Sequence, residues 1–165
     1  MTDEAGLLEI EKDRKTKTAV ICPVIKTAAG MMTAEEEAAR ENEAAGLVLA
    51  MGQEVVFCET VRMSAIVPKS FFGKGTLERL KTACEEKGAE LLVVDMPVSA
   101  VQQRNLEKML NMKVIDRTAV ILEIFGQRAQ TREGKLQVEL AHLTYQRGRL
   151  VRSWTHLERQ RGGGG

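Results

Sequence analysis

The side chains best suited to chemistry in this sequence are cations gathered near its carboxyl end. Residues 126–161 carry eight Lys/Arg and three Asp/Glu, whereas residues 1–125 carry sixteen and twenty. The sequence therefore predicts a mildly acidic domain followed by a basic segment, and cations presented together on one segment are suited to binding RNA phosphates. The RNA-binding candidates are Arg128, Arg132, Lys135, Arg149, Arg152 and Arg159.

Two stripes with helical spacing organise this basic segment over about residues 133–161. The apolar stripe contains Leu136, Leu140, Leu143, Leu150, Trp154 and Leu157, with Arg147 interrupting it. The basic stripe lies about opposite and contains His142, Tyr145, Arg149, Arg152, His156 and Arg159. A charged outer face occurs on any surface helix, but this one lacks the acidic i+4 partners that usually balance such a face. We expect the apolar stripe to pack on a preceding helix over 118–129, forming a long antiparallel hairpin whose basic stripe faces solvent.

A second group that could bind a ligand is Gly73, Lys74 and Gly75, which precede a predicted helix over 76–87. Free backbone N–H groups at a helix start, with a lysine beside them, suit a phosphate. A structural turn that needs the flexibility of glycine explains the same residues, so both interpretations stay open. Asp95 and Asp116 each end a predicted strand, where ligand crevices of open α/β sheets lie, although a helix-capping role explains Asp116 without a ligand.

No catalytic or metal-binding set can be assembled from the sequence. His142 and His156 lie on one predicted helix, about 21 Å apart at 1.5 Å per residue, which is too far to act together. Cys22, Cys58 and Cys84 are isolated and show neither zinc-site nor disulfide-framework spacing, so a reducing cytoplasm is expected. We find no signal peptide and no apolar run near the roughly 20 residues needed to span a bilayer, and we expect a soluble protein.

The segments before the basic region alternate between strand and helix patterns. Predicted strands at 18–25, 55–61, 91–94 and 114–115 are separated by helices that begin near Thr33, Thr76 and Ser99. This alternation predicts an α/β fold, with a small parallel sheet of about four strands and flanking helices, followed by the helical hairpin. Pro23 cannot donate to a strand ladder, so we expect the first strand to lie at an edge or to bulge there.

The same patterns predict the domain organisation and three helix ends. Residues 1–16 form a loosely ordered lead-in, 17–116 an α/β subdomain, 117–161 a helical hairpin and 162–165 a Gly-rich linker. Capping boxes are expected at Thr33 with Glu36 and at Ser99 with Gln102, and Gly88 is expected to end the 76–87 helix.

Four ordered motifs give the chain a family resemblance from about residue 55 onward. They are FFGKGTLERL (71–80), QQRNLEKML (102–110), KVIDRTAVILEIFGQRAQTREGKLQVELAHL (113–143) and RSWTHLERQRGGGG (152–165). Together they resemble the N-terminal domain of the HflX-type ribosome-associated GTPases. The resemblance implies an α/β subdomain and a helical hairpin that binds the large ribosomal subunit and its rRNA. The hairpin tip, about 127–135, would reach toward the peptidyl transferase centre during ribosome splitting and rescue under stress.

The resemblance also implies a partner domain. In the family, the Gly-rich stretch leads into a GTPase domain that binds GTP and Mg²⁺ and would contact this domain. The present sequence contains neither a GxxxxGK[ST] phosphate loop nor an NKxD motif, so we expect no enzymatic activity from these residues alone. Some family members bind ATP through this domain, which makes ATP binding near Gly73–Gly75 a hypothesis. The alternative function is thus a nucleotide-binding regulatory or enzymatic α/β domain whose hairpin serves as an interdomain strut.

Overall fold

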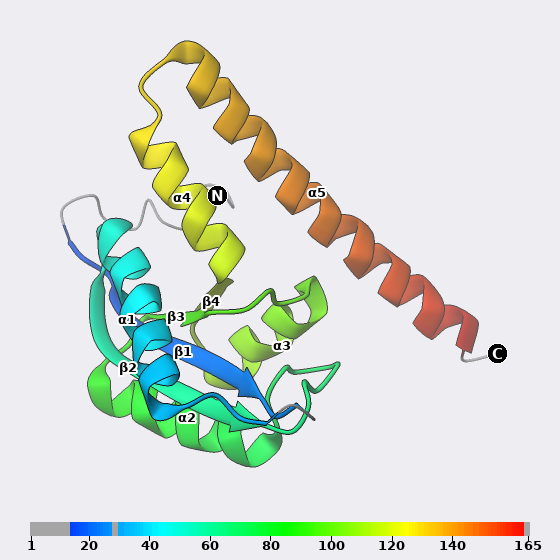
Figure 1. Cartoon of the computed structure of the whole chain (residues 1–165). Helices are drawn as coiled ribbons and strands as arrows, with labels where there is room; N and C mark the ends of the chain where they lie inside the picture. Colours follow the sequence, from blue (N-terminus) through cyan, green and yellow to red (C-terminus); the bar gives the residue numbers. More distant parts are fainter. Residues whose placement is uncertain (1–13, 28–29, 164–165) are drawn as a thin grey trace.

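The computed structural model describes residues 14–27 and 30–163, with side chains as far as Arg147. Four strands alternate with helices, and two further helices follow the last strand (Figure 1). This confirms the predicted α/β fold with a four-stranded parallel sheet. The elements are β1 (Lys17–Ile25), α1 (Ala34–Ala50), β2 (Glu54–Met63), α2 (Lys74–Lys87), β3 (Leu91–Val94), α3 (Ala100–Leu110), β4 (Lys113–Asp116), α4 (Arg117–Arg128) and α5 (Arg132–Gly163).

The sheet has the strand order β2-β1-β3-β4, and all pairs are parallel. Successive β1 side chains point to opposite faces, so Ala19 and Ile21 enter one core while Val20 and Cys22 enter the other. Helices α2 and α3 cover the first face, and α1 and α4 cover the second. A strand buried on both faces must be apolar throughout, which accounts for the nearly unbroken apolar sequence of β1.

The position of Pro23 corrects the expectation for the first strand. β1 is an interior strand, and its irregularity lies between Thr18 and Ala19 rather than at the proline. β3 is shorter than β1, and its last residue, Val94, pairs with Ile21. Pro23 therefore lies beyond the end of β3, where β1 has a neighbour only on the β2 side, and its missing N–H costs no ladder hydrogen bond.

The predicted helix ends are confirmed. Thr33 and Ser99 each accept a hydrogen bond from the backbone N–H three residues on, and Glu36 and Gln102 complete the two capping boxes. Gly88 follows α2 with a φ of 67°, the left-handed conformation that glycine adopts without steric cost. These local signals fix where three helices begin or end.

The expected long antiparallel hairpin is not clearly formed. α4 has 12 residues and α5 has 32, so the two helices can lie side by side over only part of α5. Figure 1 shows α4 rising from the sheet and α5 returning at an angle past α3. We call residues 117–163 the arm and residues 127–135 its tip.

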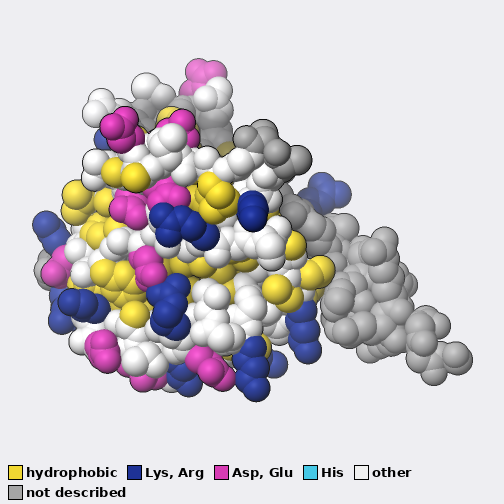
Figure 2. All heavy atoms as spheres, turned by 60° about the horizontal axis from the view of Figure 1, so that its bottom comes forward, with side chains coloured by type: hydrophobic (Ala, Val, Ile, Leu, Met, Phe, Trp, Pro, Cys, Tyr) yellow, Lys and Arg dark blue, Asp and Glu magenta, His cyan; other side chains and the backbone are white. Residues whose placement is uncertain are grey.

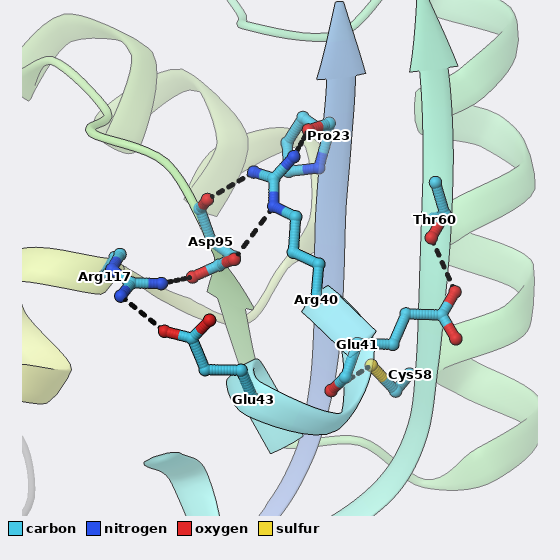
Figure 3. A network of polar contacts seen from close by, with 8 residues as sticks. All are labelled: Pro23, Arg40, Glu41, Glu43, Cys58, Thr60, Asp95 and Arg117. Atoms are coloured by element: carbon cyan, nitrogen blue, oxygen red, sulfur yellow. Dashed lines mark hydrogen bonds and ion pairs between the residues drawn. The ribbon is translucent and has the colours of Figure 1, made fainter. Parts of the chain in front are cut away.

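A network of charged side chains joins the sheet to the first turn of α4 (Figure 3). Asp95, at the end of β3, is only 3% exposed and accepts hydrogen bonds from Arg40 of α1 at 3.2 Å and Arg117 of α4 at 2.9 Å. Arg40 also donates to the carbonyls of Pro23 and Asp95, and Arg117 donates to Glu43. The buried carboxylate is therefore paired with two guanidinium groups that come from different helices.

Removing this carboxylate should destabilise the fold markedly. Asp95→Ala leaves two partly buried arginines without their shared partner, and we expect the free energy of unfolding to fall by about 2–3 kcal/mol in urea titrations. Glu59→Ala is the control, because it removes the acid of the more exposed Arg79–Glu59 pair and should cost less than about 1 kcal/mol. Equal losses in the two variants would contradict the role given to Asp95.

Candidate nucleic-acid interface on the helical arm

The short helix α4 is anchored to the sheet by one side. Val120 and Ile124 are buried in the core beneath α1, and Gln127 donates a 2.7 Å hydrogen bond to the carbonyl of Met51 at the end of α1. Phe125 is exposed, whereas Gly126 faces α5. The carboxyl end of α4 is thus held against α1, and this contact sets where the tip begins.

The long helix α5 packs on α4 partly through residues predicted to face solvent. A methyl group placed on Gly126 would lie 3.5 Å from Val138 Cγ1 and 3.9 Å from His142 Nε2. The Tyr145 hydroxyl donates a 2.8 Å hydrogen bond to Asp116, at the start of α4. The prediction that the stripe containing His142 and Tyr145 faces solvent is therefore wrong for these two residues.

The described part of the apolar stripe takes the outward position instead. Leu136 is 55% exposed, Leu140 65% and Leu143 57%, so the prediction that the stripe packs on the preceding helix is wrong for these three leucines. The remaining members, Leu150, Trp154 and Leu157, lie beyond the described side chains. The spacing identified an apolar face correctly, but spacing does not say which face meets a given neighbour. Gly126 permits a close approach by Val138 and His142, and this approach leaves the leucines pointing away from α4. We call Leu136, Leu140 and Leu143 the leucine face.

The tip carries cations that no described carboxylate neutralises. Arg128, Arg132 and Lys135 are all exposed, and none of the ion pairs between described residues involves them. Thr131 fixes the start of α5 there, because its hydroxyl accepts from the Gly134 N–H at 2.9 Å and its carbonyl accepts from the Lys135 N–H. Cations held on a projecting, capped turn can reach phosphate without first breaking an ion pair.

The surface of the α/β subdomain differs from the tip. On the face shown in Figure 2, Lys/Arg and Asp/Glu side chains are interspersed around exposed hydrophobic side chains. Several of the subdomain's arginines form ion pairs, including Arg62 with Glu37 and Arg79 with Glu59. A surface of mixed and paired charge attracts a polyanion less than the tip does.

The other candidate site residues are not brought to the tip. Arg149, Arg152 and Arg159 lie on α5 beyond the described side chains, so only their helical backbone can be placed. Gly73 caps α2 with a φ of −70°, and Lys74 is exposed and makes no hydrogen bond or ion pair within the described part of the chain. A Cβ at Gly73 or Gly75 would meet nothing within 4 Å, so steric crowding does not explain these glycines.

The two strand-end carboxylates are fully engaged in structural contacts. Asp95 is held by the two arginines described above, and Asp116 accepts from the N–H groups of Val98 and Ala119 as well as from Tyr145. The capping explanation of Asp116 is confirmed. Among the described residues, no three His, Cys, Asp or Glu side chains gather to hold a metal, and no helix has the length and apolar character to cross a membrane.

Comparison with known proteins identifies the family of this chain. The family described as "GTP-binding GTPase N-terminal" matches residues 38–126, and "GTP-binding GTPase Middle Region" matches residues 128–165. The GTPase HflX of Magnetococcus marinus is 52% identical over 124 residues, which cover 75% of this chain and 29% of that protein. The chain belongs to the HflX family. The HflX of Escherichia coli is 48% identical over 122 residues, covering 74% of this chain and again 29% of the relative.

A solved structure shows the same fold. The GTP-binding protein of Sulfolobus solfataricus, determined in complex with GDP, superposes with a TM-score of 0.61 at 23% identity, covering 85% of this chain and 40% of that one. The chain spans under a third of the length of each of the two HflX relatives named above. The similarity covers both the α/β subdomain and the arm, so the family assignment does not depend on one motif.

The contact between Tyr145 and Asp116 should fix α5 against the subdomain. Tyr145→Phe removes only the hydroxyl, and we expect a loss of about 1–2 kcal/mol in the free energy of unfolding because the acceptor is a buried carboxylate. Hydrogen exchange of α5 amides near position 145 should accelerate as well. Thr144→Ala, on the exposed side of the same turn, should change stability by less than about 0.5 kcal/mol. Equal effects of the two changes would refute the assignment.

Proposed function

We propose that this chain is the ribosome-binding part of an HflX-type GTP-binding protein and docks on the large ribosomal subunit through the tip of the arm. The observation that carries the proposal is the set of exposed tip cations, Arg128, Arg132 and Lys135, which no described carboxylate neutralises. The membership of the HflX family supports a role in ribosome splitting and rescue, and a ribosomal partner implies action in the cytoplasm.

The physical basis of docking is the exchange of counterions for phosphate. Each cation that neutralises an RNA phosphate releases a condensed counterion, so affinity falls with salt by roughly 0.7 to 0.9 log units per log unit of salt for each contact. Double-stranded RNA is contacted mainly through backbone phosphates and the 2′-hydroxyls of its wide, shallow minor groove, which an exposed projecting turn can reach. Arg149, Arg152 and Arg159 would extend the contact along a flanking duplex or face another part of the protein.

The nucleotide chemistry of an HflX-type protein would lie outside these residues. GTP and Mg²⁺ require a phosphate loop, and the sequence has no GxxxxGK[ST] motif, so GTP hydrolysis is assigned to a separate GTPase domain of a longer protein. No observation favours ATP binding at Gly73–Gly75, where Lys74 stands alone on the surface. The arm would transmit ribosome contact to the GTPase domain.

The leucine face would bind the GTPase domain of an HflX-type protein. Three leucines, each more than half exposed and aligned along one side of α5, form an apolar surface that water solvates poorly. The i, i+4, i+7 spacing suits a second helix packed along α5. The arm would therefore have one end for RNA and one face for its own GTPase region.

Reversing charge at the tip should weaken ribosome binding while the fold persists. Arg132→Glu with Lys135→Glu should abolish most binding to large subunits and lower the slope of log affinity against log salt by about 2 in cosedimentation. The matched control is Lys81→Glu with Lys87→Glu on α2, which makes the same charge change at exposed positions of the subdomain. Unchanged binding by the tip variant, or equal loss in the control, would contradict docking through the tip.

The leucine face should matter only when its partner is present. Replacing Leu136, Leu140 and Leu143 by glutamine should change the stability of this 165-residue chain by less than about 0.5 kcal/mol per site, because these side chains are exposed. In an HflX protein that includes the GTPase domain, the same triple change should cost about 1.5–3 kcal/mol per buried leucine. Similar small losses at both lengths would show that no partner covers this face.

A further inference from the structure

Two cysteine side chains meet on the α1 face of the sheet. Cys58 of β2 pairs with Val20 of β1, which places Cys22 two residues further along the neighbouring strand. Both side chains belong to the core beneath α1, and the two thiols are close enough to shift each other's pKa. Cys22 is fully buried, whereas Cys58 is partly exposed because β2 is an edge strand.

The contact makes the two thiols unequal. The hydrogen bond from Cys22 lowers the pKa of Cys58, although burial and the carboxylates of Glu41 and Asp95 oppose this shift. The same hydrogen bond, together with burial, raises the pKa of Cys22. Cys58 is thus the more acidic and more accessible thiol of the pair, and thiolate character with access is what makes a cysteine nucleophilic.

The third cysteine provides an internal comparison. Cys84 lies on α2 in the core on the opposite face of the sheet, and burial raises its pKa to about 11. It is a free thiol that is buried, mostly protonated at neutral pH and far from the pair across the sheet. Any reagent that selects thiols by acidity and exposure should therefore prefer Cys58 to Cys84.

We propose that Cys58 and Cys22 form a redox-active pair, in which Cys58 attacks a low-molecular-weight disulfide and Cys22 converts the product to an internal disulfide. In the first step the Cys58 thiolate bonds to one sulfur of the small disulfide, whose S–S bond breaks and releases one small thiolate. In the second step Cys22 loses its proton to solvent and attacks Cys58 Sγ, which releases the second small thiolate. Two protein thiols are oxidised, and the small disulfide is reduced to two thiols.

The order of the two steps follows from the contact between the thiols. While Cys58 is a thiolate, it holds the Cys22 proton through their hydrogen bond. Once Cys58 is a mixed disulfide, that negative charge is gone and Cys22 can ionise more readily. Figure 3 shows Cys58 Sγ directed at the carbonyl of Glu41, to which the thiol donates a hydrogen bond at 3.6 Å, and this hydrogen bond is lost when Cys58 ionises for the first step.

The test is treatment of the folded protein with glutathione disulfide, followed by intact mass and peptide mapping. We expect loss of two hydrogens from the protein mass and a peptide link between Cys22 and Cys58, reversed by dithiothreitol. Cys22→Ala should stop the reaction at a glutathione adduct on Cys58, and Cys58→Ser should give neither product. Cys84→Ser is the matched control and should behave as the unaltered protein.

Three outcomes would overturn the proposal. They are a glutathione adduct that persists on Cys58 in the unaltered protein, no reaction at all, and labelling of Cys84 within about tenfold of the rate at Cys58. If Cys22→Ala fails to fold, as judged by circular dichroism, the peptide link in the unaltered protein and in Cys84→Ser decides the question alone.

Discussion

The placement of the arm depends on one buried carboxylate. Asp116 is 2% exposed and accepts hydrogen bonds from the N–H of Val98 at 3.0 Å, the N–H of Ala119 at 3.1 Å and the hydroxyl of Tyr145 at 2.8 Å. A buried carboxylate destabilises the folded protein unless its oxygens are hydrogen-bonded. Moving any of these donors away from Asp116 would therefore lower the free energy of unfolding. They come from the loop before α3, the first turn of α4 and the middle of α5, and together they set the direction of the arm.

Charge is distributed in two different ways along the chain. At the sheet, Arg40 of α1 and Arg117, the first residue of the arm, share Asp95. Arg62 and Arg79 of the subdomain have their own glutamates, so these four cations serve the fold. At the tip the cations have no such partners among the described residues, and their field is directed outward. The leucine face is a third kind of surface, because its exposed apolar side chains belong neither to the core nor to the tip. It is available to a protein partner. Under the proposed function, the fold, the RNA contact and the interdomain contact would use separate sets of side chains.

The sequence predicted the elements well and the pairing of helix faces poorly. Strand and helix alternation, the capping boxes at Thr33 and Ser99 and the end of α2 at Gly88 depend on neighbouring residues, and local patterns report them. Which side of α5 meets α4 depends on the small residue Gly126 and on the Tyr145–Asp116 hydrogen bond, which are contacts between helices that periodicity cannot rank. The tip cations were found from charge alone. The arginine clamp on Asp95 was missed, because its partners are distant in sequence.

Site-specific photocrosslinking can show whether the tip meets ribosomal RNA. A benzophenone amino acid at the exposed position Gln130 would be irradiated in the presence of large ribosomal subunits, with the same probe at Lys87 on α2 for comparison. If the tip docks on the large subunit, the Gln130 probe crosslinks to ribosomal RNA at one defined region and the Lys87 probe does not. No RNA crosslink from Gln130, or the same RNA pattern from both positions, would rule out docking through the tip.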